Sequence, residues 1–350
     1  TIDDPSEYFT TLLYTGDAND NRNLTNDANA GDFKPDWLWL KERSSTSSHM
    51  IHDSNRGTSQ AVFSDTDGAQ DEDTNRVQAF QTNGFQVGTA STVNQNTITM
   101  VAWQWKCNGG TKADNDDGSV TVNLQVNQEA GFSIGTYSGT GSELTVGHGL
   151  GVTPKMHITK KLNAADAWNV YHESLGNTHG LRLNNGDAKE DFGFYGDTSP
   201  TSSVFTVGGV TNNDRLNTNG GSYVFYSFAE KQGYSKFGSY VGNGNANGAF
   251  VYTGFKPAWV MRKCSTASEQ WHIQDTKRLD FNNDSDSSIL IPSNANTEAT
   301  NTNLNMDILS NGFKCRSSDG AGNGSGRTYV YMAFAEHPFV SSEGVPTTAR

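Results

Sequence analysis

The segment GDFKPDWLWLK (residues 31–41) sets a pattern that the chain uses three times. A turn containing glycine leads into a proline, apolar residues follow, and a lysine stands six positions after the proline. The same order returns in GLGVTPKMHITK (149–160) and in GFKPAWVMRK (254–263). Internal repetition indicates that one structural unit occurs several times. The fold of the chain is therefore the fold of this unit and the way in which the copies join.

Further landmarks extend each copy in both directions. Each copy opens on Tyr-x-Gly, at Tyr14, Tyr137 and Tyr240. Downstream, NGF occurs at 83–85 and 311–313, with SVF at 203–205 in the middle copy, and each copy closes on an aromatic run. These runs are MVAWQW (100–105), YVFYSFAE (223–230) and YVYMAFAE (329–336). We predict three β repeats over residues 1–110 (with an N-terminal lead), 111–232 and 233–350 (with a C-terminal tail).

The spacing inside each copy predicts strands. Trp37 and Trp39 occupy alternate positions, which is typical of a half-buried strand with one face inward. The closing runs are apolar on both faces, as in a central strand that is covered on both sides. Clusters of Gly, Asn, Asp and Ser separate the strands. The predicted fold class is all-β, with three tandem, diverged, β-sandwich-like repeats and no substantial helix.

Two joins connect the copies. Residues 107–119, CNGGTKADNDDGS, read as a polar linker between the first two copies. Residues 230–238, EKQGYSKFG, leave so little length that the second and third copies are expected to pack together.

Composition excludes several classes of protein. Of 350 residues, 34% are apolar and only 18% are charged, yet 18 Phe, 12 Tyr and 7 Trp are available for cores, which argues against disorder. A net charge of −13 argues against nucleic acid as a partner. No apolar stretch predicts membrane insertion. Cys107, Cys264 and Cys315 are expected to be free buried thiols, with a Cys264–Cys315 bridge as the alternative. Because free thiols persist in a reducing environment, we expect the protein to assemble in a reducing cytoplasm.

Few residues suggest chemistry. P-loop, HExxH and dinucleotide motifs are absent from the sequence. His49, His52 and Asp53 could form a metal or acid–base site, but His49 stands where the other copies have tryptophan, so we interpret it as a core residue. Asp53, His172 and Asp275 share one repeat position, and the exchange of Asp for His predicts a turn-capping or surface role. No catalytic residue is assigned and an enzyme is not expected.

Two weak binding hypotheses remain. The acidic loop SDTDGAQDED offers hard oxygen ligands for calcium, the one cofactor considered, although a solvated loop is the simpler interpretation. Its candidate ligands are Asp65, Asp67, Asp71, Glu72 and Asp73. Tyr195, in a loop without a counterpart in the other copies, is a candidate for stacking on a sugar. Glu230 and Glu336 end related strands and are interpreted as surface residues rather than as a glycosidase pair.

The landmarks resemble those of tail-fibre and receptor-binding proteins of tailed bacteriophages, particularly those that infect marine bacteria. The resemblance rests on FKPDWLWLKERS (33–44), HDSNRG (52–57), the NGF motifs and the closing AFAE, and it is closest in TGFKPAWVMRK (253–263) and TYVYMAFAEHPF (328–339). It covers nearly the whole chain, but the middle copy lacks NGF. It implies a virion protein that assembles in the host cytoplasm, has other virion proteins as partners, binds a host receptor or glycan, and forms homotrimers.

The leading hypothesis is thus a structural and adhesive fibre protein for host attachment. A capsid-decorating or filament-forming protein, a lectin-like glycan-binding module and a polysaccharide depolymerase are the alternatives. Repetition of one scaffold favours architecture over catalysis, although a fold by itself does not fix a function.

Overall fold

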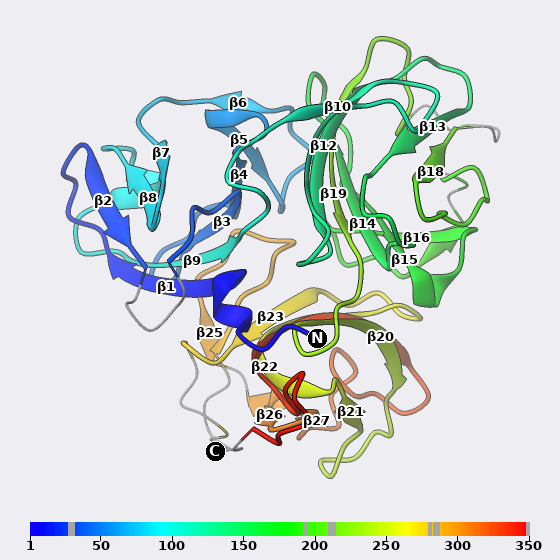
Figure 1. Ribbon diagram of the computed structural model, residues 1–350. Coiled ribbons are helices and arrows are strands. Elements are labelled where there is room, and N and C mark those ends of the chain that lie inside the picture. The colour runs from blue at the N-terminus through cyan, green and yellow to red at the C-terminus, as the bar shows by residue number, and fades with distance from the viewer. Residues whose placement is uncertain are drawn as a thin grey trace.

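The computed structural model describes residues 1–26, 32–191, 193, 195–208, 215–278, 282, 288–300 and 302–347. Strands dominate these residues, so the all-β prediction is confirmed. The helical segments of the described residues are the four-residue α1 (Ser91–Asn94) and three 3-10 turns, η1 (Pro5–Glu7), η2 (Glu173–Leu175) and η3 (Thr302–Leu304). Figure 1 shows three lobes, coloured blue to cyan, green, and yellow to red along the chain.

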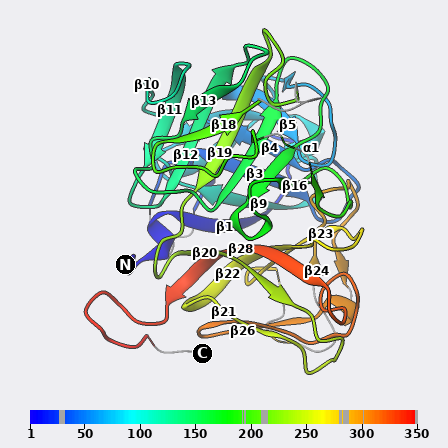
Figure 2. The ribbon, with the colours of Figure 1, turned by 90° about the vertical axis from the view of Figure 1, so that its right-hand side faces the viewer.

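The strands fall into three consecutive sets, and each set builds one lobe (Figures 1 and 2). The first lobe contains β1 (Phe9–Thr15), β2 (Arg22–Thr25), β3 (Trp37–Glu42), β4 (Met50–Asp53), β5 (Gly57–Phe63), β6 (Asp71–Glu72), β7 (Val77–Gln81), β8 (Gly84–Val87) and β9 (Thr99–Trp105). The second contains β10 (Ala113–Asn115), β11 (Val122–Asn127), β12 (Phe132–Ser138), β13 (Leu144–Gly147), β14 (Met156–Lys161), β15 (Asn169–His172), β16 (His179–Arg182), β17 (Glu190–Asp191), β18 (Val204–Val207) and β19 (Ser222–Phe228). The third contains β20 (Ser235–Val241), β21 (Phe250–Tyr252), β22 (Phe255–Cys264), β23 (Trp271–Asp275), β24 (Ser288–Ile289), β25 (Ala299–Thr300), β26 (Met306–Leu309), β27 (Gly312–Cys315) and β28 (Thr328–Pro338).

One strand order recurs in the inner sheet of every lobe. It reads β1-β9-β3-β4 in the first lobe, β12-β19-β14-β15 in the second and β20-β28-β22-β23 in the third, all antiparallel. The closing run of each repeat is the strand between the opening strand and the strand that follows the repeat proline. The prediction that these runs are central strands is therefore confirmed.

An outer sheet covers each inner sheet. The outer sheets are β2-β8-β7, β13-β18 and β21-β27-β26. The glycine of each NGF motif lies where two outer strands approach closely. A Cβ at Gly84 would lie 2.1 Å from the Leu24 carbonyl oxygen, and one at Gly312 would lie 2.0 Å from that of Val251. In the second lobe Val204 stands at this position and the glycine is on the opposite strand, at Gly147.

Two kinds of hydrophobic core result. Each lobe has its own core between its inner and outer sheets, and Leu38 and Leu40 belong to that of the first lobe. A further core is shared by all three lobes and is made by the opposite faces of the inner sheets. All seven tryptophans of the chain are buried, and all lie in this shared core: Trp37, Trp39, Trp103, Trp105, Trp168, Trp259 and Trp271.

The strand after each repeat proline is accordingly buried on both faces. Every residue of β3 is buried, because its tryptophans face the shared core while its leucines face the outer sheet. The prediction of a half-buried strand was wrong here. The sequence shows the alternation of the two faces, but it does not show that a second layer covers the other one.

The joins are also more ordered than expected. The backbone N–H groups of Cys107 and Gly109 both donate to Asp36 Oδ2, at 2.7 and 2.9 Å, and residues 113–115 form β10 at the edge of the second inner sheet. Residues 107–119 are therefore tied to both neighbouring lobes. The expectation that the second and third lobes pack together holds, but the first lobe packs against both as well. The three cysteines are free and buried, as predicted.

Candidate functional site

The repeat position of Asp53 lies at the contact between the first and second lobes. Asp53 Oδ2 accepts hydrogen bonds from Arg56 Nε at 2.6 Å and from the Tyr226 hydroxyl at 2.7 Å, and Tyr226 belongs to β19 of the second lobe. Both side chains of the Asp53–Arg56 ion pair are buried. A buried carboxylate needs such partners, because it has lost its hydration. Asp53 thus joins two lobes.

Asp275 repeats this arrangement between the third and first lobes. Its Oδ2 atom accepts from Arg278 Nε at 2.6 Å and from Trp103 Nε1 at 2.9 Å, and Trp103 belongs to β9 of the first lobe. Arg278 also donates to the Ile273 carbonyl oxygen at 3.0 Å. The guanidinium group is fully buried, so its charge is neutralised inside the protein.

His172 occupies the third equivalent position and faces the third lobe. The register of the closing strands places Met332 where the other lobes present Tyr226 and Trp103. A methionine has no polar hydrogen to donate to a carboxylate. His172 Nε2 lies 3.1 Å from the Tyr331 carbonyl oxygen and Nδ1 accepts from the Ser174 N–H, so the neutral ring donates at Nε2. Burial lowers the pKa of His172 to about 4, which keeps the ring neutral.

These three contacts run in a closed cycle, from the first lobe to the second, the second to the third, and the third to the first. The predicted turn-capping role is correct, because Asp53 and Asp275 also accept backbone N–H groups of the following turns. The predicted surface role is wrong, since all three side chains are buried. The role of the arginines was not predicted, although the motif Asp-x-x-Arg occurs in DSNR (53–56) and DTKR (275–278) and is absent from HESL (172–175).

A second set of contacts closes the same cycle through the backbone. The loops between β5 and β6, β16 and β17, and β24 and β25 donate to the neighbouring lobe through the N–H groups of Gln70, Lys189 and Glu298. Their acceptors are the carbonyl oxygens of Leu162, Ser265 and Arg43, each at 2.8 Å. The acceptors share one repeat position, eight residues after the proline. The three lobes are therefore joined by equivalent bonds in a ring.

The lysine of each repeat supports these junctions. In each case Nζ donates to the carbonyl oxygen of the next residue, at 2.7 Å for Lys41, 2.8 Å for Lys160 and 2.6 Å for Lys263. Lys160 also donates to the Asp67 carbonyl oxygen of the first lobe. Burial lowers the pKa of each ammonium group to about 8. The lysines are best understood as buried structural donors.

The structure does not assemble the catalytic or metal sites considered from the sequence. His49 lies in the shared core, where it accepts from Trp39 Nε1 at 3.0 Å and stacks on Trp103, and burial holds its pKa well below its ordinary value. The core interpretation of His49 is therefore confirmed. His52 is buried within its own lobe, with Nδ1 2.9 Å from the Thr58 carbonyl oxygen.

The acidic loop does not converge on a cation site. Asp71 and Asp73 both lie beside Arg76, at 2.7 and 3.7 Å, and Asp65 accepts from the His49 N–H. Glu72 accepts from Ser59, while Asp67 lines a different depression. Among the described residues, no three His, Cys, Asp or Glu side chains are grouped so that they could hold a metal ion. The calcium hypothesis gains no support from this arrangement, because Arg76 pairs with two of the five carboxylates and the other three have separate surroundings.

Tyr195 is not a surface residue. Its side chain is 3% exposed, packs on Tyr171 and His157, and lies with its hydroxyl 3.4 Å from the Asn169 carbonyl oxygen. The prediction that this ring is available to a sugar was wrong. Tyr195 instead belongs to the core of the second lobe.

Depressions open to the surface include two that are lined by side chains of both charges. One, of about 560 Å³, lies between the first and second lobes, where Arg215 pairs with Asp166 and Lys161 donates to Thr218, so its cations are engaged by its own walls. The other, of about 260 Å³, lies beside the outer strand β21 of the third lobe. Its lining includes Tyr252, Gly254, Glu230, Gln232, Lys236 and Phe339. We refer to it as the β21 hollow.

Fold and contacts together define an all-β protein of three fused β-sandwiches around one core. The chain belongs to the family whose model matches residues 4–338 and whose description is a domain of unknown function, DUF7483. No curated protein and no solved structure matches the chain. In the described part of the chain, none of the helices has the length and apolar character needed to cross a membrane.

Proposed function

We propose that this chain is a structural and adhesive component of a bacteriophage particle, carried on a tail fibre and presented to the host surface. The observation that carries the proposal is the shared core. Three copies of one unit bury their tryptophan-rich faces together and close a ring of equivalent bonds. Burial of this kind joins the lobes into one body that resists mechanical load and proteolysis, because local opening of one lobe would expose the others.

The motifs that resemble phage fibre proteins support the same conclusion. FKPDWLWLK supplies β3 and its tryptophans, and AFAE lies within the C-terminal half of β28. The recurring residues therefore maintain the architecture. The role proposed here is non-enzymatic, since the titratable residues at the repeat positions serve the junctions between lobes.

Localisation on intact particles tests the proposal. Antibodies against the folded chain, carrying gold particles, are expected to label the tail fibres of the phage by electron microscopy. The same antibodies, adsorbed with purified protein, serve as the control. Label on the head would favour the decorating alternative, and absence of label from every particle surface would overturn the proposal.

Two further measurements separate the remaining alternatives. Purified chain is expected to bind host cells without shortening their surface polysaccharide, whereas a depolymerase would release fragments. The homotrimer stays a prediction, and light scattering tests it against the 37.9 kDa mass of one chain. The chain already contains three units in a ring, so a single copy has approximate threefold symmetry of its own.

A further inference from the structure

The outer sheets of the three lobes differ at two equivalent positions on their outward face. The strand pairing aligns the positions because Leu24, Val146 and Val251 all point into the cores of their lobes. On either side of them the first lobe has Asn23 and Thr25, the second has Thr145 and Gly147, and the third has Phe250 and Tyr252. Packing does not require an aromatic residue at these positions, since two of the three lobes fold without one.

Both aromatic rings of the third lobe are exposed to solvent. Phe250 is 48% and Tyr252 58% exposed, and they are the aromatic members of the exposed large hydrophobic residues in the described part of the chain. They point to the same side of β21, because strand residues two apart share a face. In the first lobe the same surface is polar, and Asn23 accepts hydrogen bonds from Gln81 and Gln86. The third lobe has thus replaced a hydrogen-bonded polar surface with two rings.

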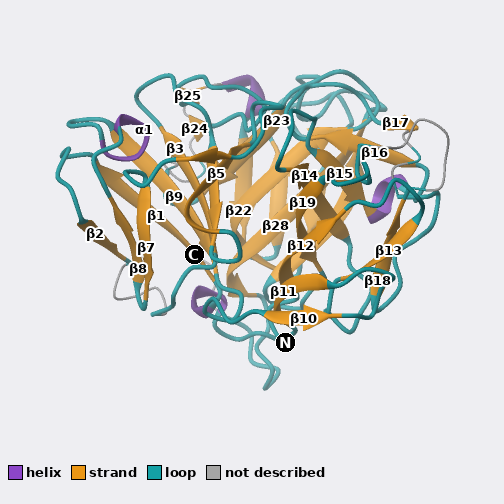
Figure 3. Cartoon of the chain, turned by 90° about the horizontal axis from the view of Figure 1, so that it is seen from above, coloured by secondary structure: helices purple, strands orange, loops and turns teal. Residues whose placement is uncertain are grey.

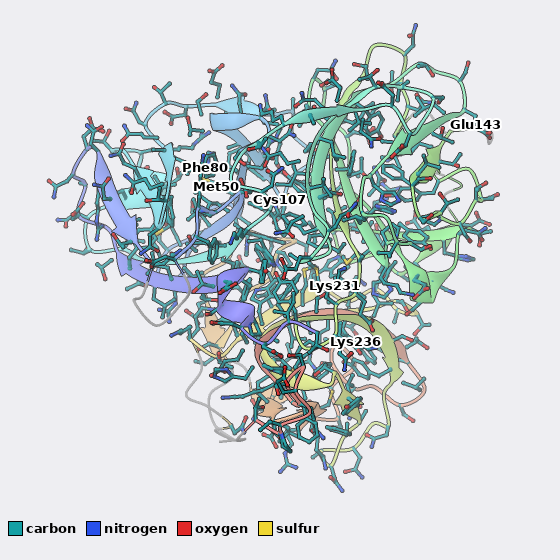
Figure 4. All side chains as sticks on the ribbon, in the orientation of Figure 1. Met50, Phe80, Cys107, Glu143, Lys231 and Lys236 are labelled. Atoms are coloured by element: carbon teal, nitrogen blue, oxygen red, sulfur yellow. The ribbon has the colours of Figure 1, made fainter. Side chains whose placement is uncertain are left out.

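The β21 hollow adds polar groups beside Tyr252. Glu230 and Lys236, which also line the hollow, form an ion pair of 2.6 Å with side chains 29% and 35% exposed, and Gln232 supplies an amide. Lys236 lies on β20 near the junction of the third lobe with the others (Figure 4). The hollow, of about 260 Å³, is therefore lined by aromatic side chains together with carboxylate, ammonium and amide groups.

We infer that Phe250, Tyr252 and the β21 hollow form a carbohydrate-binding site. A sugar ring presents C–H groups on one face and hydroxyl groups at its edge. The C–H face matches the electron-rich face of an aromatic ring, and the hydroxyl groups match charged donors and acceptors such as Glu230 and Lys236. The inference rests on the adhesive function proposed above, because it names the class of host molecule that the chain contacts.

Other occupants fit this surface less well. A second copy that presented the same two rings would match the apolar half of the surface but not the Glu230–Lys236 ion pair beside it. A lipid surface would match the two rings but not the ion pair beside them. A saccharide satisfies both the apolar and the polar halves of the site.

The test compares the full chain with a variant that takes its residues from the first lobe. Phe250→Asn with Tyr252→Thr restores the surface that the first lobe already carries, so the fold is expected to be retained. On an array of bacterial surface glycans, the unchanged chain is expected to bind a defined saccharide. The double variant is expected to lose about tenfold or more of that affinity. Glu230→Gln is expected to weaken binding by a smaller factor.

A matched control keeps the result interpretable. Asn23→Ala with Thr25→Ala changes the equivalent surface of the first lobe and is expected to leave glycan binding unchanged. Thermal unfolding of each variant establishes that the fold is intact. If the unchanged chain binds a glycan and the double variant binds it equally well, the site is wrong and the adhesive function stands. If the chain binds cells but no glycan, the carbohydrate assignment is overturned.

Failure of the proposed adhesive function would give a different experimental result. Absence of the chain from phage particles would remove the adhesive function, whatever the array shows. Concentration-dependent self-association that only the double variant abolishes would assign the surface to contacts between copies, and this would also overturn the inference.

Discussion

The three copies have similar side chains at equivalent positions of the inner sheets but different side chains at equivalent positions of the outer sheets. On the inner faces, most equivalent positions keep large apolar side chains in every lobe, with His49 as an exception, whereas on the outward faces of the outer sheets they change from polar to aromatic. The inner sets include Trp37, Met156 and Trp259; Trp39, Ile158 and Met261; and Trp105, Phe228 and Phe334. The comparison indicates that packing around the shared core restricts the inner face, while the outer face is free to specialise.

The junctions between lobes show the same rule at finer scale. Two lobes use an aspartate paired with an arginine because the neighbouring lobe offers a polar hydrogen, from Tyr226 or Trp103. The remaining lobe uses His172, because Met332 offers none. Each junction residue is matched to the side chain that it faces. Mutations at the junctions therefore test how strongly the inner faces are restricted, and mutations on the outer sheets provide the comparison.

Lowering the pH is expected to have the largest effect on the free energy of unfolding, and to act through side chains that are buried. Burial lowers the pKa values of His52 and His272 to about 3 and that of His172 to about 4. Below the ordinary value of 6.5 the unfolded chain binds protons that the folded chain does not, so stability falls as the pH falls. By pH 5 each histidine costs about 2 kcal/mol, or roughly 6 kcal/mol for the three.

Urea unfolding at pH 7 and pH 5 measures this loss. Burial raises the pKa values of Asp36 and Asp65 and works in the opposite direction, so the observed loss will be smaller than the histidine contribution. His272→Gln is expected to flatten the pH dependence, while His337→Gln, with a side chain 62% exposed, is expected to leave it unchanged. Equal stability at both pH values would contradict the neutral buried histidines.

Truncation of a side chain in the shared core is expected to have the next largest effect on the free energy of unfolding. Trp37 contacts Trp105 of its own lobe, with ring centroids 4.4 Å apart, and Tyr226 of the second lobe at 4.9 Å. Trp37→Ala is expected to lower the free energy of unfolding by about 3–5 kcal/mol. Because the core is shared, chemical denaturation should still show one transition, shifted as a whole. Separate unfolding of the first lobe would argue against a single cooperative body.

Substitutions of the junction residues are expected to cost different amounts of stability. Asp53→Ala leaves the buried Arg56 without a carboxylate and should cost about 3–5 kcal/mol. Asp275→Ala should cost less, because Arg278 keeps its ion pair with Glu298 at 3.2 Å. His172→Ala removes a neutral group and should cost about 1–3 kcal/mol. Glu173→Ala, in an exposed ion pair with Lys155, is the control and should change stability by about 0.5 kcal/mol or less. Equal losses at Asp53 and His172 would refute the difference drawn between the junctions.

The outer face is expected to show the smallest effect on stability. Phe250→Asn with Tyr252→Thr should change the free energy of unfolding by about 0.5 kcal/mol or less, because both rings are exposed. Thermal unfolding measures it. A loss comparable to that of Trp37→Ala would mean that the two rings stabilise the third lobe, and the contrast between inner and outer faces would fail.

Sequence patterns predicted the repeat strands well and the candidate sites poorly. Alternation, recurrence and the aromatic closing runs identified the strands, because side-chain periodicity is a local property. Burial of Tyr195 and the dispersal of the acidic loop were missed, since both depend on how a loop folds over residues distant in the chain. Exposure of Phe250 and Tyr252 was missed for a related reason: the FVY segment has the same apolar letters as the core strands around it.

The sequence alone determined that one strand-rich unit recurs, where its prolines, lysines and aromatic runs fall, and that thiols need not be paired. These features follow from local spacing and composition. Only the tertiary structure decided that the three units share a core, that Asp53, His172 and Asp275 lie between lobes, and that Phe250 and Tyr252 are exposed to solvent. The reason is that burial belongs to pairs of surfaces brought together from distant parts of the chain, and a linear pattern describes one surface at a time.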